Sequence, residues 1–160
     1  IVSDEGITSS RAADSWTVGA PPHAWLTVTG GSIGQGLPVA TGAALACPGR
    51  KVFAMESDGA GMYTLQSLWT QARETLDVVT VIFANRAYQI LRNELKQVGI
   101  AEAGPKATAM LDIGNPDLDW VKLANGMGVE AARATTMDQC ADLMSRSFRQ
   151  DGPFLIELIV

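Results

Sequence analysis

Apolar runs alternate with amphipathic stretches along this chain, and the alternation predicts its secondary structure. The longest runs are nearly continuous in apolar residues, which is typical of strands buried on both faces of a sheet. Strands are expected at Ile1–Glu5, Trp25–Thr29, Val52–Glu56, Asp77–Ala84, Val129–Ala134 and Phe154–Val160.

Helices are expected between these strands, where apolar residues recur at helical spacing. In Tyr63–Arg73, for example, Leu65, Leu68, Trp69 and Ala72 fall on one helix face. The expected helices are Leu37–Cys47, Tyr63–Arg73, Ile90–Val98, Asp119–Asn125 and a segment from a capping box at Thr136 to about Arg149. Trp16–His23 and Gly99–Pro116 are expected to be irregular.

This order of elements predicts an α/β fold. Strands that alternate with helices and are apolar throughout indicate a parallel sheet covered on both faces. We therefore expect a three-layer α/β/α domain with a central parallel sheet of about six strands. In such a fold, a ligand binds at the carboxyl ends of the strands.

Length, charge and cysteine content narrow the class of protein. The chain has 160 residues, which suggests a single domain over 1–160. Its net charge is −5 and it has no basic cluster, so we expect no nucleic-acid or membrane-surface partner. No apolar stretch approaches the ~20 residues of a membrane span. Cys47 and Cys140 form neither a disulfide framework nor a metal-ligand spacing, which favours reduced thiols and a cytoplasmic location.

A glycine-rich segment, Thr29–Gly36 (TGGSIGQG), lies between an expected strand and an expected helix. It resembles the nucleotide-binding loop of short-chain dehydrogenases, and Asp58 after the following strand could bind a ribose hydroxyl. Those enzymes also require a Tyr-x-x-x-Lys pair, whereas this chain has Tyr88 followed by Arg92. Arg does not replace a catalytic Lys, because its pKa cannot fall enough, so a dehydrogenase is the weaker alternative.

A second pair of segments points to a metal and a phosphate. Ser57–Ala60 (SDGA) follows one buried strand, and Ala84–Tyr88 (ANRAY) follows the next. The two polar residues, Asp58 and Asn85, are 27 positions apart. A carboxylate, an amide oxygen and a backbone carbonyl such as that of Ala87 are the hard oxygen ligands that suit Mg²⁺. Backbone N–H groups of Gly59 and Ala60 could face a phosphate.

These segments resemble the diphosphate-binding signature of thiamine diphosphate-dependent enzymes, in which Gly-Asp-Gly is followed about two dozen residues later by Asn-Asn. The resemblance extends to 30–44 and 69–91 and, more loosely, to the whole chain. It is greatest to the C-terminal domain of acetolactate synthases and benzoylformate decarboxylases. Ser57 and Ala84 replace the first Gly and first Asn of the signature, and Ala60 replaces a Ser that often follows it.

The resemblance implies a role for each matching residue. Asp58, Asn85 and the Ala87 carbonyl are implied to be the Mg²⁺ ligands. The cofactor-binding residues are implied to be Thr8, Gly31, Ser32, Ile33, Asp58, Gly59, Ala60, Asn85, Ala87 and Tyr88. The Gly31 carbonyl would accept from the 4′-amino group, the Ile33 N–H would face a ring nitrogen, and the Ile33 side chain would hold the two cofactor rings in a V.

Simpler alternatives exist for several of these residues. Asp58 and Thr8 could each cap a helix, and Ile33 could be an ordinary core residue. Ile90, Leu91 and Glu94 match positions that line the substrate pocket, although a solvent-facing position is the favoured interpretation for Glu94. His23, the single histidine, could titrate near the substrate or lie on the surface.

The resemblance also implies what this chain lacks. The family activates its cofactor with a Glu on the N-terminal pyrimidine-binding domain of a partner subunit, and neither Glu5 nor Glu56 fits that motif. We therefore expect this chain to be one domain of a longer protein, inactive alone, that forms a homodimer or homotetramer. Any flavin would lie on an absent domain.

The expected function is to bind Mg²⁺–thiamine diphosphate in an enzyme that decarboxylates a 2-oxo acid and transfers the acyl carbanion equivalent, as acetolactate synthases do. A benzoylformate-type decarboxylase and a 2-hydroxyacyl- or oxalyl-coenzyme A lyase are the alternatives within the family. A non-catalytic cofactor-binding module is an alternative of a different class.

Overall fold

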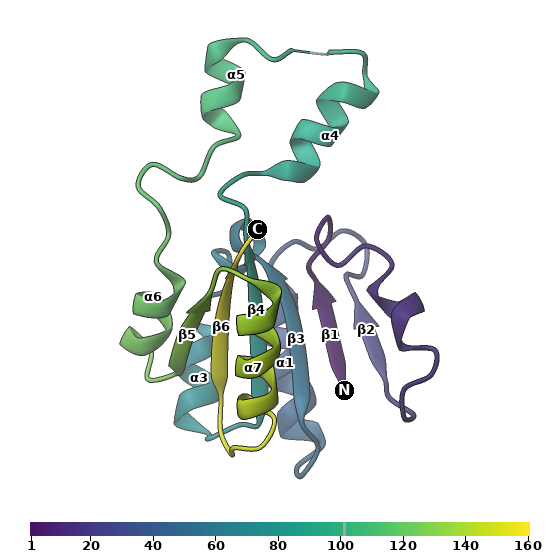
Figure 1. The fold of residues 1–160 in the computed structure, drawn as a ribbon, viewed down its shortest axis with the longest axis vertical. Helices are drawn as coiled ribbons and strands as arrows, with labels where there is room; N and C mark the ends of the chain where they lie inside the picture. The colour runs from purple at the N-terminus through teal and green to yellow at the C-terminus, as the bar shows by residue number, and fades with distance from the viewer. Residues whose placement is uncertain (101) are drawn as a thin grey trace.

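A single six-stranded, all-parallel sheet forms the centre of the computed structural model, which describes residues 1–100 and 102–160 (Figure 1). Its strands are β1 (Val2–Glu5), β2 (Trp25–Thr27), β3 (Val52–Ser57), β4 (Val78–Ala84), β5 (Glu130–Ala134) and β6 (Phe154–Ile159). They are arranged in the order β2-β1-β3-β4-β6-β5. All six expected strands are present, and the expected parallel sheet is confirmed.

Three helices cover one face of the sheet. They are α1 (Gly36–Ala46), α3 (Ser67–Arg73) and α6 (Trp120–Gly126). Their apolar side chains meet in one core, where Leu37 and Trp120 pack with Ile82 and Leu155 of the central strands. Because these side chains are fully buried, this face supplies much of the hydrophobic stabilisation of the fold.

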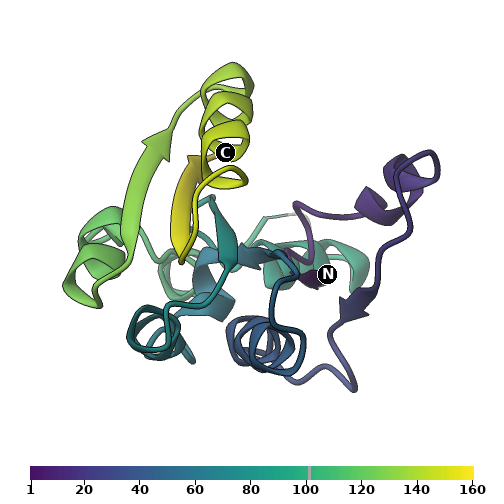
Figure 2. The same cartoon turned by 90° about the horizontal axis from the view of Figure 1, so that it is seen from below.

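The opposite face is covered by one helix, α7 (Met137–Ser147), which Figure 2 shows on the far side of the sheet from α1 and α3. Its Cys140 packs against Phe154 and Ile156 of β6. The helix begins at the expected cap, since the Thr136 side chain accepts a hydrogen bond from the Gln139 N–H. The three-layer arrangement is therefore confirmed, with a second helical layer that is thin in the described part of the chain.

The expected helix at Tyr63–Arg73 is wrong at its start. The structure has a single turn of helix, α2 (Asp58–Gly61), then a connecting turn, and α3 only from Ser67. Asp58 lies inside α2 and not at its N-cap, which is Ser57.

One of the two stretches expected to be irregular contains a short helix, and the other overlaps one. The 3-10 helix η1 covers Ala13–Thr17 and so overlaps the start of Trp16–His23. The helix α5 covers Pro105–Met110 within Gly99–Pro116, and Pro105 occupies a first-turn position that suits proline. Ala101, also in that stretch, lies outside the described residues.

The helix α4 (Gln89–Gln97) and α5 extend beyond the carboxyl ends of the strands (Figure 1). Both ends of this excursion are fixed at the same point. Ala87 and Asp112 form an antiparallel bridge, with hydrogen bonds from Tyr88 N to Leu111 O and from Ile113 N to Arg86 O, each 3.0 Å long. The excursion therefore begins and ends at the turn that follows β4.

Candidate cofactor site at the carboxyl ends of the strands

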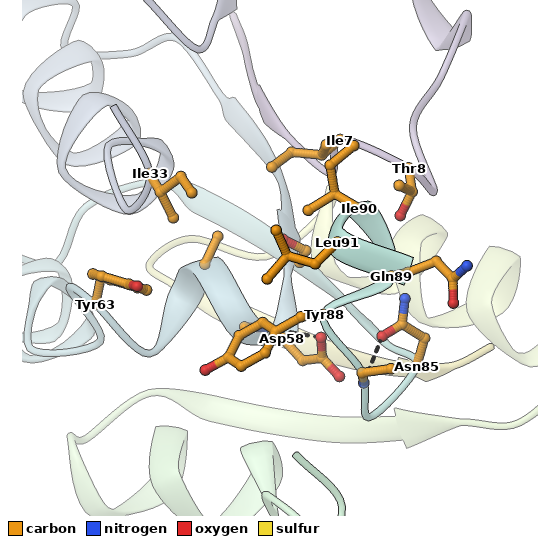
Figure 3. Close-up of a pocket in the computed structure, with 14 residues that line it drawn as sticks. Ile7, Thr8, Ile33, Asp58, Tyr63, Asn85, Tyr88, Gln89, Ile90 and Leu91 are labelled. Carbon is orange, nitrogen blue, oxygen red and sulfur yellow. Dashed lines mark hydrogen bonds between the residues drawn. The ribbon is translucent and has the colours of Figure 1, made fainter. Parts of the chain in front are cut away.

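A cavity of about 230 Å³ opens at the carboxyl ends of β1, β3 and β4 (Figure 3). Segments that follow these three strands form most of its wall, and one residue before α1 completes it. The lining residues are Ile7, Thr8, Ile33, Ser57, Asp58, Gly59, Ala60, Tyr63, Asn85, Ala87, Tyr88, Gln89, Ile90 and Leu91. The expected ligand-binding edge of the sheet is therefore hollowed, at the position that the fold class indicates.

Asp58 is a buried carboxyl group in the wall of this cavity. Only 2% of its surface is exposed, and its two oxygens accept from Gly59 N at 2.8 Å and from Arg86 N at 2.7 Å. Burial raises the pKa of Asp58, and the hydrogen bonds from Arg86 and Gly59 oppose this rise. Among the described residues no ion pair involves Asp58. A buried carboxylate without a cationic partner is suited to a cation from outside the chain.

The turn after β4 brings two more oxygens to the same wall. Asn85 Oδ1 accepts from Ala87 N at 2.9 Å, and the Ala87 carbonyl accepts from Gln89 N at 2.8 Å. Each oxygen keeps a second lone pair for a metal. Since Arg86 N donates directly to Asp58, the carboxylate lies against this turn.

This donor set fits Mg²⁺, which prefers oxygen ligands and takes only one or two carboxylates from a protein. Within the described residues there is no cluster of three or more His, Cys, Asp or Glu side chains suited to a metal. The expected set does not require one, because its only acidic member is Asp58.

Gly59, in the SDGA segment, is in close contact with the ring of Tyr88. A Cβ atom added to Gly59 would lie 2.9 Å from Tyr88 Cε1, so only glycine lets the tyrosine ring lie against α2. The Gly59 N–H donates to Asp58, and a phosphate bound there would have to replace this hydrogen bond. Ala60 is buried beside it.

The loop before α1 places Ile33 in the cavity wall with 51% of its surface exposed. The alternative that Ile33 is a core residue is therefore wrong. Gly31 and Ser32 are exposed and do not line the cavity. Ile33 N donates to the Gly31 carbonyl at 2.9 Å, so the two backbone groups expected to face the pyrimidine ring bond to each other in this structure.

The remaining expected residues divide into two groups. Thr8, Tyr88, Ile90 and Leu91 line the cavity. Thr8 caps no helix, because the next helical turn begins at Ala13. Glu94 is exposed and lies outside the lining, so its expected place in the pocket is not supported and the solvent-facing alternative holds.

His23 is a surface residue, with Nδ1 2.8 Å from the Pro21 carbonyl oxygen. It does not line the cavity, so a role near the substrate is not supported.

Four lining residues were missed by sequence reasoning: Ile7, Ser57, Tyr63 and Gln89. Three of them directly adjoin predicted site residues at strand ends, which is the signal that could have found them. The Gln89 Nε2 donates to Asn93 Oδ1 at 2.9 Å across one turn of α4.

Two further carboxyl groups are buried beside the site, at paired positions of neighbouring strands. Glu5 of β1 and Glu56 of β3 are 1% and 0% exposed. Burial, and then the nearby Glu5 charge, raises the pKa of Glu56 to about 9, so Glu56 is protonated at neutral pH. Neither side chain lines the cavity.

The Glu56 shift predicts a pH-dependent stability. A carboxyl whose pKa rises on folding stabilises the fold fully below its ordinary value of 4.5, and this contribution is lost as the pH rises toward about 9. The slope from one group is at most about 1.4 kcal/mol per pH unit. Glu56→Gln, which mimics the neutral form, should flatten this slope in denaturant unfolding of the cofactor-free intact protein between pH 6 and 9. Parallel profiles for the two proteins would contradict the assignment.

Comparison with known proteins agrees with this geometry. Residues 4–158 match the family described as thiamine pyrophosphate enzyme, C-terminal TPP binding domain. The chain therefore belongs to this family, and the alternative of a short-chain dehydrogenase is wrong.

The relatives define the group within the family. Over its whole length the chain is 53% identical to IlvX of Mycobacterium tuberculosis, whose provisional name is acetolactate synthase large subunit. The match covers 31% of the length of IlvX. It is 35% identical to benzoylformate decarboxylase of Pseudomonas aeruginosa, over 86% of this chain and 25% of that protein.

A solved structure gives the same picture. The thiamine diphosphate-dependent 4-hydroxybenzoylformate decarboxylase of Rhodococcus jostii superposes with a TM-score of 0.84 at 31% identity, covering 98% of this chain and 28% of that one. The chain thus spans under a third of the length of the relatives that it matches.

Proposed function

We propose that this chain holds Mg²⁺ and thiamine diphosphate at the cavity, within an enzyme that decarboxylates a 2-oxo acid and transfers the acyl carbanion equivalent to an acceptor. The observation that carries the proposal is the buried Asp58, which has no cationic partner among the described side chains and lies against the Asn85–Ala87 turn. The 53% identity to a relative named as an acetolactate synthase supports carboligation as the reaction.

Each part of the cavity has a proposed role. Asp58, Asn85 and the Ala87 carbonyl hold the metal, and the metal holds the diphosphate. The proposed diphosphate contacts are Thr8, Gly59, Ala60 and Tyr88, and the proposed pyrimidine contacts are Gly31, Ser32 and Ile33. Ile90 and Leu91 line the cavity, and their proposed role is to contact the substrate.

When bound, the cofactor supplies the electron sink for decarboxylation. The proposed contribution of this chain is to position the cofactor. The metal site would hold its diphosphate, and the loop that carries Ile33 would hold its pyrimidine ring. Such positioning contributes to rate because it removes the freedom that the reacting groups would otherwise lose in the transition state.

The site is incomplete without a proton donor for the pyrimidine ring. Glu5 and Glu56 lie outside the cavity lining, which supports a source on another domain. We propose that an N-terminal domain of a partner subunit provides it, in a homodimer or homotetramer, and that this chain alone is inactive. No described helix has the length and apolar character needed to span a membrane. We propose a cytoplasmic location from the cysteine content.

A benzoylformate-type decarboxylase is the second candidate, favoured by the similarity to the Rhodococcus structure. Incubating the intact protein with pyruvate or benzoylformate, thiamine diphosphate and Mg²⁺ separates the two. Carboligation predicts CO₂ release together with a new carbon–carbon bond in the product, identified by mass spectrometry. An aldehyde as the sole organic product would favour the decarboxylase. Cofactor binding without any CO₂ release would favour a non-catalytic module.

A further inference from the structure

The loop from Gly30 to Gly36, which carries Ile33 to the cavity, has little internal support. Gly30, Gly31 and Gly34 have positive φ angles of 63°, 70° and 89°, which glycine adopts without strain. Space around Gly30 and Gly31 is open. The helix that follows, α1, has no side-chain cap of its own, although its first N–H groups need acceptors.

Glu5, at the end of β1, supplies an acceptor for the first N–H group of α1, that of Gly36, and a second one for Gly34 in the loop before the helix. Its Oε1 accepts from Gly34 N at 2.6 Å and its Oε2 accepts from Gly36 N at 2.5 Å, so one carboxylate bridges both ends of the turn into α1. Hydrogen bonds to a buried charged acceptor are stronger than neutral ones. Because Glu5 is 1% exposed, water does not compete for these hydrogen bonds.

Ser3, two residues earlier on the same strand, fixes the other side of Gly36. Its Oγ donates to the Gly36 carbonyl at 3.0 Å, and it is likewise 1% exposed. Residues two apart on a strand point to the same face, which is why both reach one glycine. A Cβ at Gly36 would collide with Glu56 Oε2 and lie 2.9 Å from both Cβ and Oε2 of Glu5, so a side chain there would displace both carboxyl groups.

The same strand end leads directly into the opposite part of the cavity wall. Gly6 follows Glu5, and Ile7 and Thr8 then line the cavity. Glu5 therefore joins two lining segments that are far apart in the sequence, the loop after β1 and the loop before α1.

We propose that Glu5, with Ser3 beside it, is a positioning residue for the bound cofactor. Its carboxylate fixes the backbone from Gly34 to Gly36 and, through it, the place of Ile33 in the cavity wall. The inference rests on the proposed function at one point, namely that Ile33 contacts the cofactor.

The test is Glu5→Gln in the intact protein. A carboxamide accepts only one of the two N–H groups and turns its own NH₂ toward the other. Amide exchange at Gly34 and Gly36, measured by mass spectrometry, should accelerate roughly tenfold or more. Turnover at saturating thiamine diphosphate and Mg²⁺ should fall roughly tenfold or more, while cofactor affinity should fall less, since Asp58 and Asn85 are untouched.

Glu157→Gln is the matched control. Glu157 is 2% exposed on β6, where it pairs with Arg133 away from the cavity. This variant should lose stability but keep its turnover per folded molecule and the exchange rates at Gly34 and Gly36.

The outcomes separate the inference from the proposed function. Wild-type turnover and wild-type amide exchange in Glu5→Gln would overturn the inference alone. A wild-type protein that binds no thiamine diphosphate would overturn the proposed function and the inference with it. If Glu5→Gln does not fold, Ser3→Ala provides a second test, because it removes the hydrogen bond from Ser3 Oγ to the Gly36 carbonyl. Amide exchange at Gly36 should then be faster and turnover a few-fold lower. No change in either quantity would overturn the inference.

Discussion

Replacing Asp58 by Asn should weaken Mg²⁺-dependent binding of thiamine diphosphate to the intact protein by about 100-fold or more, since even residues that only support metal ligands cost 10–100-fold when removed. The substitution keeps the shape of the side chain and removes the one negative charge offered to the metal. The cofactor-free protein should still fold. It loses one of the two backbone hydrogen bonds that Asp58 accepts, because an amide NH₂ cannot accept one, but burial already raises the pKa of Asp58 and disfavours its charged form, which offsets part of this loss. Asn85→Ala should have the same direction of effect. Calorimetric titration measures both.

Asp77→Asn provides the control for a lost carboxylate. Asp77 immediately precedes β4 at the opposite end of that strand, where it pairs with Lys51 at 3.0 Å. Its replacement should leave the cofactor affinity unchanged. Wild-type affinity in both Asp58→Asn and Asn85→Ala would show that the metal lies elsewhere.

Replacing Ile33 by Ala should lower turnover at saturating cofactor by roughly tenfold or more, since small misplacements of reacting groups carry large losses of rate. Affinity for the cofactor should fall less, because the proposed metal and diphosphate contacts remain. Ile33→Leu and Ile33→Met keep most of the volume and should keep most of the activity.

The melting temperature distinguishes this role from a structural one. A buried Ile loses about 2–5 kcal/mol on truncation to Ala, but Ile33 is half exposed and should lose much less. A large fall in melting temperature with normal turnover per folded molecule would mean that Ile33 only supports the fold.

The strands were the most predictable part of the fold. A run such as Val78–Ala84 is apolar because both faces of a central strand are covered. Such a run can be recognised from the local sequence alone, without knowing which strands and helices pack against it. The edge strand β2 is shorter than expected, three residues within Trp25–Thr29, since a strand with one neighbour has fewer hydrogen bonds to extend it.

The short helices were less predictable. In α2 the glycines Gly59 and Gly61 lie against the rings of Tyr88 and Trp120, and such close approaches to distant side chains leave no pattern in the local sequence. The helix α5 has six residues and no buried side chain, so it lacks the apolar face from which a helix is recognised.

The candidate site was predictable in its chemistry more than in its shape. The Asp58–Asn85 spacing pointed to the correct edge of the sheet, because strand ends meet there. The roles of Glu5 and Ser3 could not be found in this way, since their partners, Gly34 and Gly36, are some 30 residues distant in sequence.

Titration of the intact wild-type protein with thiamine diphosphate, once with excess Mg²⁺ and once with a chelator, tests the proposed site most directly. The Asp58 carboxylate can hold a diphosphate only through a metal, because the two groups are both negatively charged. Tight binding of one cofactor per chain is therefore expected with Mg²⁺, and a loss of about 100-fold or more with the chelator. Equal affinity in both titrations, or no binding in either, would contradict a magnesium-bridged diphosphate at the carboxyl ends of β3 and β4.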